Sequence, residues 1–209
     1  REESKIEENN KEIKQWKRIE VLKDYRFYII CMTMLAMPWI ATGSFVYQSF
    51  ISTSKEWGPY VIAQSFMAYS ILSVITLFIS GFLIDKFSSR KLLIYMNIPL
   101  LFGTIVLYYF DAPLSSFVFF GLVGVTNGLA NVLGSSTWAE IYGVKYIGSI
   151  KALTTALMVF STAFGTALFG FLIDIGFSIE DIAVVSGTYI FGSIILLYLV
   201  KNKLNPHYL

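Results

Sequence analysis

The feature that most constrains this chain is where its charges are missing. Six stretches contain no Asp, Glu, Lys or Arg, and each is at least 19 residues long: 27–54, 57–84, 92–110, 112–139, 152–173 and 182–200. A helix of about 20 apolar residues spans the ~30 Å hydrocarbon core of a bilayer, and lipid admits only helices or closed barrels. Strand-like alternation is absent, so the sequence predicts six transmembrane helices, at about 27–50, 59–84, 92–110, 114–138, 149–173 and 182–200.

The composition supports a lipid environment. Hydrophobic residues make up 56% of the chain and charged residues only 14%, whereas soluble domains carry about 25% charged residues. The net charge of +2 does not indicate a nucleic-acid partner, because the basic residues lie where they would anchor the membrane topology.

The basic residues predict the orientation. If the N-terminus is cytoplasmic, the cytoplasmic segments hold 15 of the 16 Lys and Arg residues, and the outer loops hold only Lys55. Positive charge concentrates on the cytoplasmic side of membrane proteins. We therefore expect a multi-pass protein of a plasma or bacterial inner membrane, with both termini in the cytoplasm.

Three regions follow from this pattern. Residues 1–24 form a charged cytoplasmic segment, 25–200 the transmembrane domain and 201–209 a cytoplasmic tail. The first segment is either an amphipathic helix on the membrane face or a solvated linker, because its apolar residues recur at near-helical spacing: Ile6, Ile13, Trp16, Ile19 and Leu22. The chain begins with Arg and lacks a signal-peptide pattern, so we expect a piece of a longer protein, or a processed or incomplete one.

The string GFLID occurs twice, as Gly81–Asp85 and Gly170–Asp174. The copies end the second and fifth predicted helices, and three membrane crossings separate them, so they should lie on opposite sides. This arrangement is typical of two three-helix units with inverted topology. The expected fold is all-α, with six transmembrane helices arranged as two inverted three-helix repeats.

The segment Gly81-Phe-Leu-Ile-Asp85-Lys86-Phe-Ser-Ser-Arg90-Lys91 resembles the loop signature of the major facilitator superfamily. Ser88 replaces the usual Gly and Ser89 a basic residue. The segments 138–143 and 148–151 also resemble the second half of such proteins. The resemblance covers residues 25–200 and implies the C-terminal six-helix half of a secondary active transporter. Its partners would be the missing N-terminal half, a small solute and, in a symporter or antiporter, a co-transported ion.

The resemblance also implies a gate on the cytoplasmic side. Gly81 and Lys91 belong to the loop motif, and Asp85, Arg90 and Glu140 would form a latch that holds the outward-facing state. The alternative is that these charges only anchor the topology and form incidental ion pairs, each worth ~0–1 kcal/mol.

Polar residues inside the predicted helices are candidates for the wall of a solute cavity, which the resemblance places beside the first and fourth helices. They are Tyr47, Gln48, Gln64, Tyr69, Asn127, Asn131 and Thr155. The alternative is that they mediate contacts between helices, an interpretation that is favoured for Gly124–Gly128 and Ser161–Gly165.

The predicted helices contain no ionisable side chain other than Tyr and Cys. If the transporter is coupled to protons or takes an anionic solute, the charged residues that this requires lie in the other half. The sequence does not indicate an enzyme, a metal site or a cofactor. Its single His is His207, and Gly134-Ser-Ser-Thr has no base beside it. Two alternative functions stay open: a self-assembling six-helix carrier or pore, and a non-transporting membrane scaffold.

Overall fold

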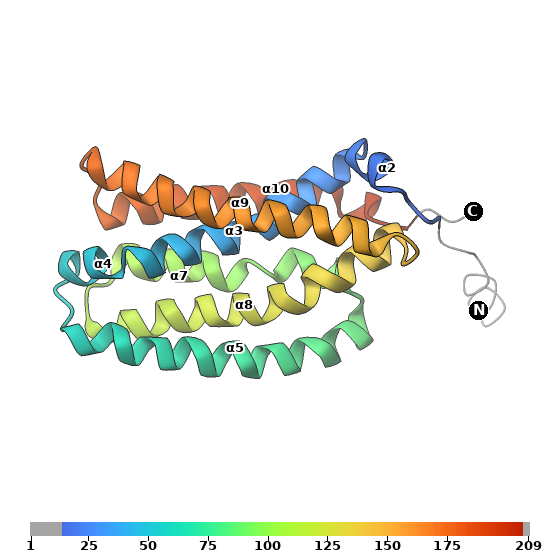
Figure 1. Cartoon of the computed structure of the whole chain (residues 1–209). Coiled ribbons are helices and arrows are strands. Elements are labelled where there is room, and N and C mark those ends of the chain that lie inside the picture. Colours follow the sequence, from blue (N-terminus) through green and yellow to red (C-terminus); the bar gives the residue numbers. More distant parts are fainter. Residues whose placement is uncertain (1–13, 207–209) are drawn as a thin grey trace.

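The computed structural model describes residues 14–206, and within this range the chain forms helices and no strand. Figure 1 shows the long helices running side by side, with α2 at one end of the bundle and α4 at the other. In chain order the elements are α2 (Arg18–Leu22), α3 (Tyr25–Val46), α4 (Gln48–Ser54), α5 (Pro59–Phe87), α6 (Ser89–Leu92), η1 (Leu93–Tyr95), α7 (Ile98–Tyr109), α8 (Pro113–Tyr142), α9 (Ile147–Asp174), α10 (Ile179–Val200) and η2 (Lys201–Lys203).

The prediction of six transmembrane segments is confirmed. Six helical segments are long and apolar enough to cross a membrane: Tyr25–Val46, Tyr60–Phe87, Ser89–Tyr109, Pro113–Tyr142, Ile147–Asp174 and Ile179–Lys203. Most extend a few residues beyond the predicted bounds, because the helices continue past the charge-free stretches into charged residues. The region 1–13, which includes part of the predicted amphipathic segment, lies outside the described residues. Within 14–24 only α2 is helical.

Two of the predicted helices are interrupted. The first was expected to run to residue 50, but α3 ends at Val46, and Tyr47 leaves helical geometry before α4 begins. The third is divided into α6, η1 and α7, with the break before Pro99 in the first turn of α7. Proline has no N–H to donate and disfavours helical geometry in the preceding residue, so a helix tends to restart there.

The packing of the helices has the symmetry of an inverted repeat. α5 packs against α8 as α9 packs against α3, and α7 packs against α8 as α10 packs against α3. The three helices α3, α5 and α7 therefore correspond in order to α8, α9 and α10. Each contact between the two units has a counterpart when the units are exchanged. In Figure 1, α5 and α9 end at opposite ends of the bundle, so the two GFLID copies also lie at opposite ends.

α3 is the central helix of the bundle. Of its apolar stretch 67% is buried, against 6% for α5 and 22% for α9. Three side chains from other elements donate hydrogen bonds to its carbonyl groups: Tyr189 to Met32 (2.9 Å), Asn97 to Thr33 (2.6 Å) and Ser161 to Leu35 (2.9 Å). These bonds satisfy the donors away from water and hold α7, α9 and α10 against α3.

Glycines allow the closest helix contacts. A Cβ on Gly165 of α9 would collide with the backbone of Trp39 in α3, and a Cβ on Gly124 of α8 would collide with the carbonyl of Tyr69 in α5. A Cβ on Gly128 would lie 2.6 Å from the carbonyl oxygen of Ser73. These contacts support the packing interpretation of the small residues, since backbones can approach only where side chains are absent.

We expect Gly165→Val to separate α9 from α3. Overpacking typically costs ~1–3 kcal/mol, and here the obstacle is backbone, which cannot rotate away. The midpoint of thermal unfolding in detergent should fall clearly. The matched control is Gly192→Val in α10, where an added Cβ meets no atom within 4 Å. Equal midpoints for the two variants would contradict the close contact of α9 with α3.

Candidate functional site

A partly enclosed cavity of about 60 Å³ lies between α3, α8 and α9. We call it the α3–α8–α9 cavity. α8 contributes one face to its wall, with Asn127, Asn131, Gly134 and Trp138 spaced three or four residues apart. This spacing places the four residues on the same side of a helix. Asn127 and Asn131, two of the residues predicted to line a solute cavity, lie on the wall of the α3–α8–α9 cavity.

The two asparagines are held by hydrogen bonds within the protein. Nδ2 of Asn127 donates to Oγ of Ser73 on α5 at 2.8 Å, and Nδ2 of Asn131 donates to the carbonyl of Asn127 at 2.9 Å. Asn127 thus joins two helices as well as facing the cavity. The interpretations as cavity residue and as helix contact both apply to it.

α3 supplies most of the apolar wall through Cys31, Met34, Met37 and Pro38. Pro38 lies inside α3 without ending it. It has no N–H to give to the carbonyl four residues earlier, which belongs to Met34, so the helix is locally weakened beside the cavity. The methionine side chains are flexible and can adapt their shape to an occupant.

α9 closes the third side with Thr154, Leu157 and Met158. The sequence analysis selected Thr155, but the side chain that lines the cavity is its neighbour Thr154, and Thr155 is exposed on α9. Since α9 is apolar on most of its surface, the sequence did not show which of the two adjacent threonines faces α3 and α8.

The other predicted cavity residues lie elsewhere. Gln48 belongs to α4 and lines a separate groove of about 430 Å³ with Trp57 and Phe66. Gln64 is exposed on α5. Tyr47 stacks on Phe169 with ring centroids 6.3 Å apart, and Tyr69 packs edge-on against Phe45 at 5.0 Å. In this structure the seven candidates do not form one site.

The predicted gate residues fall into two groups. Arg90 and Glu140 form an ion pair, with Nε of Arg90 2.9 Å from Oε1 of Glu140. Oε2 of Glu140 accepts hydrogen bonds from the backbone N–H and the hydroxyl of Ser89, at 2.9 and 2.5 Å. The short helix α6 is thereby fixed to the end of α8.

Asp85 is exposed and has no ion-pair partner in the part of the chain that the structure describes. Lys91 is also exposed, and Gly81 has open space where a Cβ would stand. The structure therefore joins Arg90 to Glu140 but leaves Asp85 outside this pair.

A second charged cluster lies at the same end of the bundle. Asp24 and Arg26 form a buried ion pair of 2.7 Å, and the hydroxyl of Tyr142 donates to Oδ2 of Asp24 at 3.1 Å. Arg26 also donates to the carbonyls of Lys203 and Asn205. We call this end, where α2, α6 and η2 meet, the terminal end. Sequence reasoning missed the cluster because Arg26 was interpreted only as one of the basic topology anchors.

The segment before α2 is bound to the same place. The backbone N–H of Trp16 donates to the carbonyl of Tyr142 at 3.0 Å, and Lys145 N–H donates to the side chain of Gln15 at 2.9 Å. Gly143 has φ +83° and contacts Gln15 where a Cβ would stand. Only glycine can adopt this φ angle and also leave room for the side chain of Gln15. Gly143 therefore allows the segment before α2 to pass across the end of α8.

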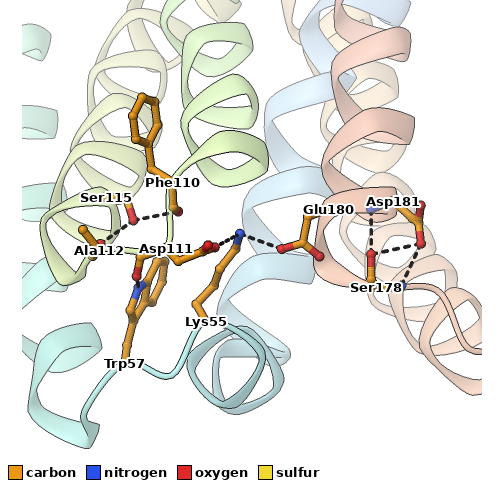
Figure 2. A network of polar contacts seen from close by, with 9 residues as sticks. All are labelled: Lys55, Trp57, Phe110, Asp111, Ala112, Ser115, Ser178, Glu180 and Asp181. Atoms are coloured by element: carbon orange, nitrogen blue, oxygen red, sulfur yellow. Dashed lines mark hydrogen bonds and ion pairs between the residues drawn. The ribbon is translucent and has the colours of Figure 1, made fainter.

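At the opposite end of the bundle, which we call the far end, Lys55 joins the segment after α4 to the connection between α7 and α8 and to the first turn of α10 (Figure 2). Nζ of Lys55 lies 2.6 Å from Oδ1 of Asp111 and 2.6 Å from Oε1 of Glu180, and the Lys55 side chain is 1% exposed. Burial alone would lower the pKa of Lys55, but its hydrogen bonds to the two carboxylates outweigh burial and raise the pKa. Trp57 adds a 2.7 Å hydrogen bond to the carbonyl of Asp111. Lys55, predicted only as the lone basic residue of the outer loops, thus holds this end together.

The α3–α8–α9 cavity itself is free of charge. No Lys, Arg, His, Asp or Glu within the described range lines it. In the same range, no three residues of the types His, Cys, Asp and Glu are grouped so that they could hold a metal ion. What the cavity offers is apolar surface, thioether and thiol sulfur, and two amide groups.

Comparisons with known proteins agree with this architecture. Residues 28–207 match the sequence model of the Major Facilitator Superfamily. The in meso crystal structure of the POT family transporter PepTSo has a similar fold, with a TM-score of 0.66 at 15% sequence identity. The similarity covers 87% of this chain but only 38% of that chain, so this chain spans well under half of its length. A search of curated proteins gives no match.

We expect Ser88→Gly to stabilise the protein. Ser88 has φ +70° and ψ 147°, a backbone region that is nearly restricted to glycine, and its buried hydroxyl has no hydrogen-bond partner among residues 14–206. Such strain costs ~1–3 kcal/mol, so the thermal midpoint should rise. The neighbouring control Ser89→Gly removes a hydrogen bond to Glu140 and should lower it. A midpoint for Ser88→Gly at or below that of the parent protein contradicts the strain.

We expect Asp24→Asn to destabilise the protein in a pH-dependent way. Burial alone would raise the pKa of Asp24, but hydrogen bonds from Arg26 and Tyr142 outweigh it and lower the pKa below its ordinary value. A lowered pKa stabilises the fold above the ordinary value of about 3.9, and this contribution is lost as the pH falls through the lowered value. Breaking a buried pair costs ~3–5 kcal/mol.

Thermal midpoints measured from pH 7 to pH 3 test this. The difference between the parent protein and Asp24→Asn should be largest at pH 7 and should shrink below about pH 4. Glu20→Gln is the control, because Glu20 is only partly buried and its contacts among residues 14–206 are local, with Lys14 and the start of α2. A difference that does not change with pH would show that the charge of Asp24 is not what stabilises this end.

Proposed function

We propose that this chain, which belongs to the major facilitator superfamily, is one half of a secondary active transporter that moves a small solute by alternating access. The six transmembrane segments, the inverted-repeat packing and the fold similarity to a transporter support this proposal. The 38% coverage of that transporter supports a half, with the N-terminal half as its partner. Membership of this family favours a transporter over an enzyme.

The partner half would cover α5 and α9. These two helices are the least buried of the long ones, and they carry the exposed polar side chains Gln64 and Thr155. A polar group facing lipid without a hydrogen-bond partner is unfavourable. Contact with a second helical unit, or with water between the two units, accounts for these side chains better than lipid does.

The α3–α8–α9 cavity would form this half's part of the solute site. The observation that carries the proposal is that two amides, Asn127 and Asn131, face an otherwise apolar and uncharged hollow inside a transmembrane bundle. Small-molecule sites typically combine an apolar wall with a few polar groups that fix the orientation of the ligand. Gln48, Gln64 and Thr155 do not line this cavity and would contribute to the solute site only when the other half is present.

The terminal end would face the cytoplasm, because the basic residues concentrate there. Arg90 and Glu140 are already paired within this half, so they would serve as a fixed base for the gate. Asp85 is exposed at the end of α5, on the helix that the partner would cover. We assign the contact that holds one transport state to Asp85.

Asp85→Asn should change the balance of inward- and outward-facing states of the full-length protein. The shift should reach up to about fivefold, the value for an exposed ion pair worth ~1 kcal/mol. A cysteine introduced by Thr155→Cys, in a Cys31→Ala background, would be labelled from each side of the membrane with an impermeant maleimide. The ratio of the two labelling rates reports the balance.

Asp174→Asn is the matched control, since Asp174 ends the second GFLID copy, is also exposed, and lies at the far end. It should not shift the labelling ratio in the same direction as Asp85→Asn. An unchanged ratio in Asp85→Asn contradicts the gate role of Asp85. Labelling from one side only, in every variant, contradicts alternating access.

A further inference from the structure

We propose that the α3–α8–α9 cavity binds the aliphatic end of a small solute whose head group donates a hydrogen bond, a short-chain amine or alcohol rather than a carboxylate. The inference rests on the proposed function in that it takes this cavity as part of the solute site. It goes further by naming the chemical class of the solute. Binding can be measured without transport, so the two proposals can fail separately.

Asn131 offers an acceptor to a head group that donates a hydrogen bond. Its Nδ2 donates to the backbone carbonyl of Asn127, an atom that can only accept, so the nitrogen branch of the amide points to the helix backbone. The Oδ1 branch accepts no hydrogen bond from any described residue. Asn131 lies on the cavity wall, and its amide is therefore an acceptor available to a ligand.

The surroundings disfavour an anion. A carboxylate needs cations or several N–H donors when it leaves water. Throughout the described range, the cavity wall carries no Lys, Arg or His, and the hydroxyl of its single threonine, Thr154, donates to the carbonyl of Lys151 at 3.1 Å. An ammonium or hydroxyl head finds the Oδ1 acceptor of Asn131 in this cavity. A carboxylate could use only the second N–H groups of Asn127 and Asn131, and no cation on the wall offsets its charge.

The volume of the cavity limits the size of the solute's apolar group. A dry cavity of ~150 Å³ holds benzene, and this cavity measures about 60 Å³. It fits a branched or short alkyl group and is too small for an aromatic ring. The wall that such a group would touch is formed by Met34, Met37 and Met158, whose flexible side chains can close around an aliphatic group.

Gly134 leaves room for this group. A Cβ on Gly134 would meet no atom within 4 Å, although Gly134 lies inside α8 and lines the cavity. The open space at this position is therefore a property of the cavity and not a requirement of helix packing, unlike the space at Gly124. Filling it should remove the alkyl site while the fold is kept.

Cys31 provides a direct readout, because it lines the cavity and is the single cysteine of the chain. The purified protein in lipid nanodiscs would be treated with methyl methanethiosulfonate, and the modification of Cys31 followed by mass spectrometry. Isobutylamine, isobutanol and isobutyrate share a four-carbon skeleton and differ in the head group. Each would be titrated into the millimolar range.

The amine and the alcohol should slow the modification of Cys31, and isobutyrate should not. The comparison between isobutylamine and isobutanol shows whether the head group is cationic or neutral. Asn131→Leu should weaken protection by the amine and the alcohol about 3- to 10-fold, the effect of losing one hydrogen bond. Ser136→Ala is its control, because Ser136 lies on α8 outside the cavity and, within the described residues, its hydroxyl donates to the carbonyl of Val132 in the same helix.

Gly134→Leu should abolish protection by the amine and by the alcohol. Gly192→Leu, a helical glycine with the same open space outside the cavity, should leave protection unchanged. Benzylamine should protect less than isobutylamine. Protection by isobutyrate equal to that by isobutylamine, or protection that survives Gly134→Leu, overturns the inference.

Failure of the proposed function has a different signature. If protection follows the expected pattern but the labelling of Thr155→Cys shows no alternation between the two sides, the binding site stands and the transport mechanism fails. If alternation is observed and none of the compounds protects Cys31, the transporter stands and the assigned solute class fails.

Discussion

The structure depends on one constraint: inside the hydrocarbon, polar groups must find their partners within the protein. α3 shows how this is met. Its carbonyls at Met32, Thr33 and Leu35 accept hydrogen bonds from α10, from the start of α7 and from α9. Each of these donors would be unfavourable in lipid, and each is satisfied by a helix backbone that is already buried. The same bonds fix three helices around α3, so satisfying the donors and assembling the bundle are one process.

Charges follow the same constraint, and they gather at the two ends of the bundle. At the terminal end, Asp24 and Arg26 pair under Tyr142. At the far end, Lys55 joins Asp111 and Glu180, which belong to the connection after α7 and the start of α10 (Figure 2). Both clusters connect segments that are distant in sequence. Ion pairs thus hold the two ends of the bundle. The cavity between the ends has an uncharged wall, whose contacts are mostly apolar packing.

The sequence was sufficient for the spans and for the repeat, because both leave signals along a single line of residues. Charge-free stretches mark the spans, and the two copies of GFLID mark the symmetry. Rotation of a helix about its axis leaves no such signal when the helix is apolar all round. For this reason Thr155 was selected where Thr154 lines the cavity. Gln48 was grouped with the first helix for another reason: the charge-free stretch 27–54 continues across the break at Tyr47. The cluster of Asp24, Arg26 and Tyr142 requires contacts 118 residues apart, which spacing cannot show.

The cavity and the terminal end are physically continuous. Trp138 lines the cavity and stacks on Tyr142, with ring centroids 6.0 Å apart and planes 16° apart. Tyr142 in turn donates to Asp24, and its carbonyl accepts from Trp16. A shift of Trp138 would therefore disturb an aromatic stack, a buried ion pair and the segment before α2 together. Packed elements of this kind move as a unit and do not deform gradually. In a rocking motion we would therefore expect one rigid body at this end of the bundle. It would consist of the C-terminal half of α8, the start of α3 and the segment 15–24.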